Sequence, residues 1–391
     1  MSSASISWVV RGRLLTAWSL QPCVYMTHSR DRHAPPFCPN PTCAFHTGAT
    51  GSWKWVRFGS YSREVRPYRV RRFRCEHCGH TFGEQSFRLT YWLKRPALLA
   101  TVFQRLNSCS GFRQIASELH CSPQTVALHT ARLARHCMLF HEQLRPKGAL
   151  EEPLTLDGFQ SFEWSQYHPM LFHNVVGKHS HFFHGFTDSE LRRSGCMTKR
   201  QKDTRTRLER EHGRPDPRSV EQEVARVLAI VAPLPQALEL HTDEHPDYPR
   251  ALRALPHLDI THHTISSRAA RTSSNPLFPI NLLDLLIRHC GANHKRETIA
   301  FSKRRQSAAE RLWVFLVWRN YLKWFSERRH DATPAMRAGV CTSRWSVRRV
   351  LWRRIFPSRV RLPDRWQDHY WRRTPTRCIA HPRRHTLTLA T

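Results

Sequence analysis

Acidic residues and long apolar runs are both scarce in this 391-residue sequence. Asp and Glu together number 30 against 62 Lys and Arg, which gives a formal net charge of +32. A nucleic-acid partner is the simplest explanation of this excess, because basic side chains that neutralise phosphates release condensed counterions. A generally basic, arginine-rich composition without such a partner is the alternative. No apolar run approaches the roughly 20 residues that span a bilayer, so the sequence predicts no membrane partner.

Cysteine is too sparse for a disulfide-rich secreted domain. The 12 cysteines form no dense framework for this length, and one tight subset has metal-ligand spacing. This usage favours a reducing cytoplasm. Residues 1–33 predict a disordered basic tail, in which Arg11 and Arg13 interrupt an apolar stretch that resembles a poor signal peptide. Met26 is an alternative start of the chain.

Residues 34–84 predict a small β domain that holds zinc, a zinc ribbon. FCPNPTC supplies Cys38 and Cys43, and RCEHCGHTF supplies Cys75 and Cys78. Between them the chain alternates aromatic or apolar residues with basic ones, which is the period of a β-strand. Four thiolates suit tetrahedral Zn²⁺, and so small a unit needs the metal to fold. The alternative ligands in this segment are histidines: His46, His77 and His80.

Residues 85–148 predict a helical DNA-binding domain with a helix-turn-helix. In GFRQIASELHCSPQTVALHTARLARHC, Cys121 and Ser122 form the expected turn. Ser122 is a good N-cap and Pro123 a good first residue for the second helix, which is then free to enter a major groove. An ordinary helical hairpin is the alternative. The candidate DNA contacts lie on the second helix: Gln124, Thr125, His129 and Arg132.

Residues 149–330 predict a mixed α/β domain. The expected order is three strands, a helix, a strand, a short helix, a strand and then long helices, which suits a sheet of the ribonuclease-H kind. The charged segment 188–218 is expected to be an insertion or an exposed helical arm and not core. In residues 331–391 Trp and Arg alternate, which predicts either an aromatic, basic clamp on DNA or a helical cap with a solvated arginine face.

Two aspartates stand at the ends of apolar runs that predict buried strands, Asp157 in LTLDGF and Asp243 in LELHTDEHPDY. Carboxylates at strand ends in so basic a chain predict a site for Mg²⁺ or Mn²⁺, which prefer oxygen ligands. Two such ions that share carboxylates stabilise the attacking and the leaving oxygen in phosphodiester chemistry. Gly158 is expected to leave room for metal and phosphate. A strand-end cap or a salt bridge to a local arginine is the alternative for each aspartate.

A third ligand is expected on the helix that NLLDLLIRH predicts. Asp284 lies three residues after Asn281, so both side chains lie on one helical face. Asn281 offers a carbonyl oxygen to a metal or a hydrogen bond to a phosphate. Glu244 and Asp247 lie near Asp243, but Asp243 is preferred because it directly follows the apolar run.

These parts in this order resemble the DDE-type transposases of bacterial insertion sequences that have an N-terminal zinc ribbon and helix-turn-helix ahead of a ribonuclease-H-like domain. The resemblance covers most of residues 34–330 and rests on CPNPTC…CEHCGHTF, GFRQIASELHCSPQTV, LTLDG, LHTDEHPDYPRAL and RETIAFSKR. It implies Asp157 and Asp243 as the first two catalytic acids. The family usually has Glu as the third, often near an Asn or Gln one turn earlier. Here Asn281 precedes Asp284, and Asn281 can itself occupy the Glu position.

The resemblance implies a cytoplasmic, nucleoid-associated bacterial enzyme that pairs two element ends, and therefore at least a dimer. Zn²⁺ would be structural and Mg²⁺ or Mn²⁺ catalytic. Hydrolysis at the end of the element would free a 3′-hydroxyl that attacks target DNA. Two alternatives remain: an inactive or repurposed DNA-binding protein derived from such an element, and a structure-selective nuclease of the same fold.

Overall fold

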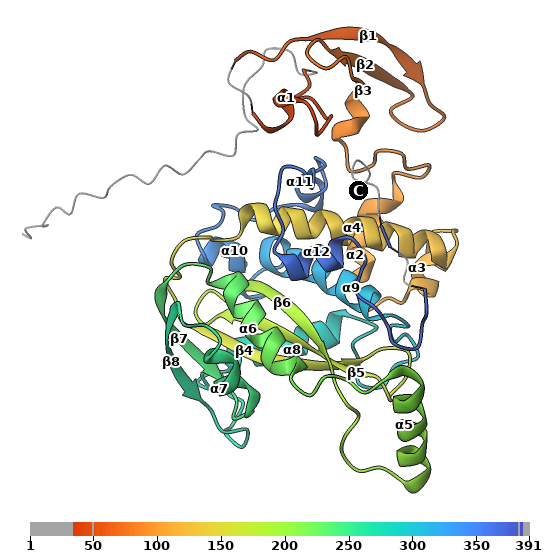
Figure 1. Cartoon of the computed structure of the whole chain (residues 1–391). Coiled ribbons are helices and arrows are strands. Elements are labelled where there is room, and N and C mark those ends of the chain that lie inside the picture. Colours follow the sequence, from red (N-terminus) through yellow and green to blue (C-terminus); the bar gives the residue numbers. More distant parts are fainter. Residues whose placement is uncertain (1–33, 49–50, 382–383, 386–391) are drawn as a thin grey trace, which may run out of the picture.

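The computed structural model describes residues 34–48, 51–381 and 384–385. The expected tail at residues 1–33 lies outside them. The chain forms a small N-terminal lobe, a layer of helices beneath it, and a five-stranded sheet below that layer (Figure 1). It is therefore a mixed α/β protein of several parts, with a small antiparallel sheet at its N-terminal end.

The N-terminal lobe is a three-stranded antiparallel sheet in the order β1-β2-β3. Along β2 the buried residues Val70, Phe73 and Cys75 are separated by exposed or half-buried arginines, as the sequence period predicts. Phe73 and Cys75 therefore pack on one side of the sheet with Phe82, whereas Val70 lies on the other side against Gly83. The elements of this lobe are α1 (Ala44–Thr47), β1 (Trp55–Ser62), β2 (Arg69–Cys75), β3 (Thr81–Gly83) and the 3₁₀ turn η1 (Glu84–Phe87).

The helical layer begins with α2 (Leu98–Leu106), α3 (Phe112–Glu118) and α4 (Pro123–Leu144). The turn between α3 and α4 is as predicted, because the Ser122 Oγ accepts the Thr125 backbone N–H at 3.1 Å and Pro123 opens the helix. A helix of 22 residues crosses the whole molecule. It therefore packs on the domain below as well as on its own hairpin.

The sheet has the strand order β6-β5-β4-β7-β8. β4, β5 and β6 are antiparallel neighbours, whereas β7 and β8 run parallel to β4. Parallel neighbours need crossovers, and α6 and α7 supply them. The predicted element order is confirmed. The elements are β4 (Leu154–Phe162), β5 (Pro169–Gly177), β6 (Phe183–Glu190), α5 (Lys199–His212), α6 (Ser219–Val231), β7 (Gln236–Thr242), α7 (Asp247–Leu252) and β8 (Leu258–Thr264).

The two faces of the sheet pack against different helices. Leu154, Leu156 and Val175 share a core with α6. Phe159 and Phe172 point the other way, into a core that includes α8 (Phe278–Cys290) and α9 (Arg305–Val317). Because strand side chains alternate with a period of two, Asp157 lies on the α8 face, between Thr155 and Phe159.

The core on the α8 face does not stop at the expected domain boundaries. It joins residues of α2, α3 and α4 to the sheet, to α9 and to the C-terminal segment. The segments on either side of the expected domain boundaries at 148/149 and 330/331 therefore share one hydrophobic core. The remaining elements are the π-helical turn η2 (Trp318–Leu322), α10 (Pro334–Arg337), α11 (Val347–Val350) and α12 (Asp364–Tyr370).

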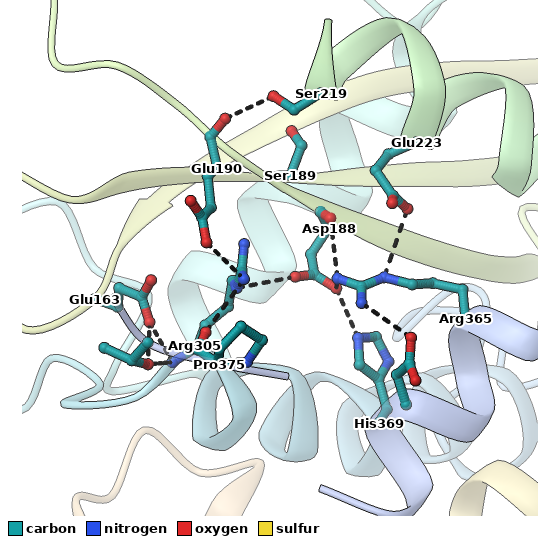
Figure 2. A network of polar contacts seen from close by, with 12 residues as sticks. Glu163, Asp188, Ser189, Glu190, Ser219, Glu223, Arg305, Arg365, His369 and Pro375 are labelled. Carbon is teal, nitrogen blue, oxygen red and sulfur yellow. Dashed lines mark hydrogen bonds and ion pairs between the residues drawn. The ribbon is translucent and has the colours of Figure 1, made fainter. Parts of the chain in front are cut away.

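The expected insertion at 188–218 is wrong at its start. Asp188 is fully buried at 1% exposure and belongs to β6, whereas α5 has no buried residue and forms the exposed arm. Arg365 and His369 of α12 approach the Asp188 carboxylate at 2.7 and 2.6 Å (Figure 2). Although burial raises the pKa of Asp188, the charges of Arg365 and Arg305 and the hydrogen bond from His369 hold it well below its usual range.

His369 is neutral in this network. The Trp313 indole N–H donates to His369 Nδ1 at 3.1 Å, so the ring proton is on Nε2 and is donated to Asp188. Burial also lowers the pKa of His369. Trp366 and Tyr370 on the same helix have 0% exposure. α12 is thus a buried cap on β6.

Gly185 makes the docking of this cap possible. Its φ is +150°, and a Cβ there would lie 2.4 Å from Trp366 Cζ2. We expect Gly185→Ala to lower the free energy of unfolding by about 2 kcal/mol or more, because the indole ring is enclosed and cannot move aside. Urea denaturation measures this. Gly195→Ala is the matched control, since Gly195 also has positive φ but nothing within 4 Å. An equal loss of free energy of unfolding in both variants would show that backbone strain causes the loss and that the Trp366 contact does not.

Candidate active site and zinc centre

Asp157 and Asp243 lie side by side on one face of the sheet. The parallel pairing of β4 and β7 aligns Leu154 with Leu240 and Thr155 with His241. Asp157 lies two residues further along β4, and Asp243 directly follows the last residue of β7, so this register brings them close enough for the charge of Asp243 to act on Asp157. Each carboxylate is held by a nearby backbone N–H: Asp157 Oδ1 by that of Gly158 at 2.6 Å, and Asp243 Oδ1 by that of His245 at 3.0 Å.

Asp284 reaches the same place from α8, which packs on β4 and β5. Its Oδ1 accepts a hydrogen bond from Asn174 Nδ2 at 3.3 Å. Asn174 is fully buried on β5 and is the direct partner of Asp157 in the strand pairing. One amide side chain therefore lies between the first and the third aspartate.

The electrostatics of this cluster differ from those of other acids in the protein. Within the described residues, no ion pair closer than 4.0 Å involves Asp157, Asp243 or Asp284, although Lys and Arg number 62. Burial and the charge of Asp243 raise the pKa of Asp157 to about 6. Burial and the charge of Asp157 raise the pKa of Asp284 well above its usual value. Carboxylates that repel one another in this way favour a bound cation.

The donor set fits Mg²⁺ or Mn²⁺. Three half-buried carboxylates lie near enough for their charges to interact, and Asn174 Oδ1 is a buried oxygen without a hydrogen-bond partner in the described part of the chain. Oxygen ligands of this kind suit hard cations. The three aspartates do not form a compact cage, because only the four cysteines, among the residues described, bring three or more ligand atoms within 4.8 Å of one another.

The remaining predicted residues of this site lie elsewhere or act differently. Asp247 pairs with Arg250, and the exposed Glu244 accepts the Ser267 backbone N–H. Asn281 lies one turn before Asp284 on α8 and is half-buried.

Gly158 does not make room for metal and phosphate, which corrects the expectation. It follows Asp157 and so points to the opposite face of the sheet, where a Cβ would meet Leu171 at 3.3 Å.

Two site residues escape sequence reasoning. Asn174 stands in an apolar strand without a motif, and only the β4–β5 register brings it opposite Asp157. Tyr248 on α7 is 3% exposed, and its pKa is raised by burial and by the charges of the three aspartates. In the sequence, Asn174 is only a polar residue inside an apolar run. Its position opposite Asp157 follows only from the pairing of β4 with β5.

The four predicted zinc ligands meet in the N-terminal lobe. Sγ of Cys38 lies 3.6 Å from that of Cys78, and Sγ of Cys43 lies 3.9 Å from that of Cys75. Sulfurs around a tetrahedral zinc ion at about 2.3 Å are about 3.8 Å apart, so the spacing fits the metal and is far too long for a disulfide. Four close cysteines that could bind zinc are therefore present.

The surroundings of one sulfur, that of Cys75, favour a thiolate, whereas burial raises the pKa of Cys38 and of Cys43. Burial raises the pKa of Cys75, but the Trp53 indole N–H at 3.3 Å and backbone N–H groups outweigh it and lower that pKa to about 7. Asn40 Nδ2 lies 3.7 Å from Cys78 Sγ. Donors aimed at a metal-bound sulfur stabilise its charge.

The histidine alternatives are not needed for zinc. His46 uses both ring nitrogens elsewhere, on the Cys38 carbonyl at 2.8 Å and the Ser358 hydroxyl at 2.7 Å. The latter contact ties the lobe to the C-terminal segment. His77 Nδ1 lies 3.6 Å from Cys43 Sγ, which places it beside the quartet.

The four predicted DNA contacts on α4 fall into two groups. Gln124 is exposed and Thr125 is half-buried at the start of the helix. His129 is 5% exposed, and burial lowers its pKa to about 4. Arg132 donates to the carbonyls of Leu89 and Tyr91 at 2.9 and 2.7 Å. His129 and Arg132 are thus directed into the protein, because α4 is covered after its first turns.

Comparisons with known proteins identify no family. No protein-family model and no curated protein matches the sequence. A solved chain in the cryo-electron microscopy structure of the simian T-cell lymphotropic virus intasome in complex with the PP2A regulatory subunit B56 gamma matches with a TM-score of 0.26 and 15% identity, over 61% of this chain and 72% of that one. A TM-score this low establishes neither fold nor activity. None of the helices in the described part of the chain is long and apolar enough to cross a membrane.

We expect one zinc ion per chain in the purified protein, measured by elemental analysis. Cys43→Ser removes a buried ligand, so zinc content should fall to near zero and a protease should cut the N-terminal lobe. Cys196→Ser is the control, because Cys196 is exposed and distant from the quartet. Retention of zinc and of protease resistance in Cys43→Ser would contradict a four-cysteine site.

Mn²⁺ in the millimolar range should raise the melting temperature of the zinc-loaded protein, because a ligand that binds only the folded state stabilises it. Asp157→Asn removes one charge from the cluster and should abolish most of that shift. Asp259→Asn, on an exposed position of β8 in the same sheet, should keep it. Equal shifts in all three proteins would exclude a specific cation site at these aspartates.

Proposed function

We propose that this protein is a DDE-type transposase of a bacterial insertion sequence, which binds terminal inverted repeats and catalyses metal-dependent cleavage and transfer of DNA strands. One observation carries the proposal: the charges of Asp243 and Asp284 both interact with that of Asp157, and none of the three has an ion-pair partner among the described residues of a chain of net charge +32. A buried cluster of like charges is costly and persists where function requires it.

The architecture supports this proposal. Three antiparallel strands, a crossover helix and two parallel strands place the carboxylates on neighbouring strands, which is the arrangement expected of a ribonuclease-H-like domain. A four-cysteine lobe and a helix-turn-helix precede it in the expected order.

A basic groove supports DNA as the substrate. It has a volume of about 720 Å³ and lies between the start of α4 and residues 299–304. Gln124 lines it together with Arg113, Lys303 and Arg304, and no acidic residue is among its described lining residues. The groove therefore places the RETIAFSKR stretch beside the helix proposed to meet DNA. Phosphate groups would neutralise these cations.

The chemistry follows from the residues. Mg²⁺ or Mn²⁺ held by Asp157, Asp243 and Asp284 would stabilise charge on the attacking and the leaving oxygen. The Gly158 and His245 N–H groups fix two carboxylates, and Asn174 fixes the third. Tyr248 excludes water on one side because it is fully buried there. No nucleophilic serine or tyrosine is needed, because water or a 3′-hydroxyl attacks.

One observation favours a second function, that of an inactive or repurposed DNA-binding protein. The third acid is Asp284, one methylene shorter than the Glu that the resemblance implies, and its Oδ1 is engaged by Asn174. A shorter acid that is already hydrogen-bonded reaches less far toward a metal.

The test uses the purified protein and DNA that contains the ends of the element, taken from the genomic sequence that flanks the coding region. The protein should cleave these ends with Mg²⁺ or Mn²⁺, whereas Asp157→Asn should lower cleavage at least a thousandfold and keep its affinity for the ends within about threefold. Asp259→Asn should behave as the wild type. Cleavage that survives in Asp157→Asn would overturn the assignment of the site.

Asp284→Glu separates the two functions. If the wild type binds the ends but does not cleave them and Asp284→Glu restores cleavage, the protein is an inactive derivative. Strand transfer of a cleaved end into a plasmid distinguishes a transposase from a structure-selective nuclease. If the wild-type protein does not bind the ends of the element at all, both proposed functions are refuted.

A further inference from the structure

A cleft in the N-terminal lobe takes no part in the site described above. It lies between the β1–β2 hairpin, β3 and the segment that leads to α2, and its volume is about 470 Å³. That size falls within the range of about 300–1,000 Å³ typical of small-molecule pockets. Tyr61 from β1 and Tyr91 and Trp92 from the linker supply its aromatic surface.

Trp92 has an exposed side chain and a strained backbone conformation. It is 81% exposed, the largest exposed fraction among the tryptophans of the described residues, and its φ of +61° is a value that favours glycine. It occupies the third position of a turn closed by the Leu93 N–H and the Thr90 carbonyl at 3.1 Å. Arg132 anchors the preceding residue through the Tyr91 carbonyl. The fold thus keeps a large apolar ring in water at the cost of backbone strain, which points to a ligand.

Gln85 supplies an unpaired hydrogen-bonding group at the wall of the cleft. The residue is 5% exposed and lines the cleft. Its Oε1 is buried and has no hydrogen-bond partner in the part of the chain that the structure describes. A buried amide left unpaired costs free energy that a partner with complementary donors and acceptors restores. The edge of a nucleobase is such a partner, since glutamine pairs with adenine in this way.

The charges around the cleft suit a phosphate group and do not suit a second copy of this chain. Arg63 and Arg72 line it, and no acidic residue does so among its described lining residues. A second copy of a chain with net charge +32 would be repelled. The convex surface of duplex DNA does not enter a concave, aromatic-lined cleft, whereas a base that has left the stack does.

We propose that this cleft binds one unpaired nucleobase of DNA, with Trp92 and Tyr61 stacking on its faces, Gln85 contacting its edge and Arg63 with Arg72 contacting the adjoining phosphate. The inference relies on the DNA partner of the proposed function but not on its chemistry. It gives the ribbon a specific role, the capture of a frayed or single-stranded nucleotide next to the duplex that α4 contacts.

The test compares three forms of one fluorescently labelled duplex at fixed salt: blunt, with a three-nucleotide overhang, and with an abasic overhang of equal length. Wild-type protein should bind the overhang about tenfold more tightly than the blunt duplex, because one aromatic stack gives a gain of this order. The abasic overhang should lose most of that gain, since it keeps the phosphates but not the bases.

Trp92→Ala should remove the preference for the overhang and change the affinity for the blunt duplex less than twofold, while Trp92→Phe should keep most of the preference. Zinc content and circular dichroism report whether each variant is folded. Trp352→Ala is the matched control, because Trp352 is another exposed tryptophan, at 43%, and lies outside the cleft. It should retain the preference.

Equal affinity of the wild type for blunt and overhanging DNA, or a preference unchanged in folded Trp92→Ala, overturns the inference and leaves the proposed cleavage intact. A preference for the overhang without cleavage supports the cleft and counts against the transposase. If the protein binds none of the three duplexes, both this inference and the proposed function are refuted.

Discussion

Repulsion among Asp157, Asp243 and Asp284 is the constraint on which the functional argument depends. In the same protein Asp188, Glu142 and Glu310 are buried too, but each lies against an arginine. Among the described residues the three aspartates form no direct ion pair, and their hydrogen bonds come from Asn174 and backbone N–H groups, although the charges of Arg271 and Arg288 act on them from further away. Burial without a counter-charge raises carboxyl pKa values and favours a cation, whereas the arginines beside Asp188 hold its pKa below its usual range and tie α12 to β6. The protein thus uses its few acids in two distinct ways.

Rigidity around the cluster comes from a neighbouring polar network. Asp188 on β6 holds Arg365 and His369 of α12 and Arg305 of α9, and Glu190 adds a second contact to Arg305 at 2.9 Å (Figure 2). These contacts tie α9 and α12 to β6 at one edge of the sheet, whereas α8 packs on the central strands β4 and β5. The C-terminal segment also reaches the N-terminal lobe through Ser358 and His46. One continuous core and these ties make the lobe, the helical layer and the sheet mutually dependent.

Sequence reasoning succeeded where the signal was local. The cysteine spacing predicted the quartet, Ser122 and Pro123 predicted the start of α4, and apolar runs predicted the strands β4 and β7, although Asp157 lies inside β4 and only Asp243 follows a strand end. It failed where packing decided. His129 and Arg132 follow the helical pattern of a DNA-contacting face, yet the linker at Leu89–Tyr91 covers them. Asp188 stands at the start of a highly charged segment, yet it is fully buried.

The amino-acid order by itself determined the short-range features, because caps, turns, strand period and metal spacing need only a few neighbouring residues. Tertiary structure alone decided which face of each element is covered, since that depends on partners far away in the chain. Asn174 meets Asp284 over 110 positions, and Asp188 meets His369 over 181. Neither contact has a local signature. Strand register and helix docking created both, and with them the difference between a carboxylate without a direct ion pair and one that holds the fold together.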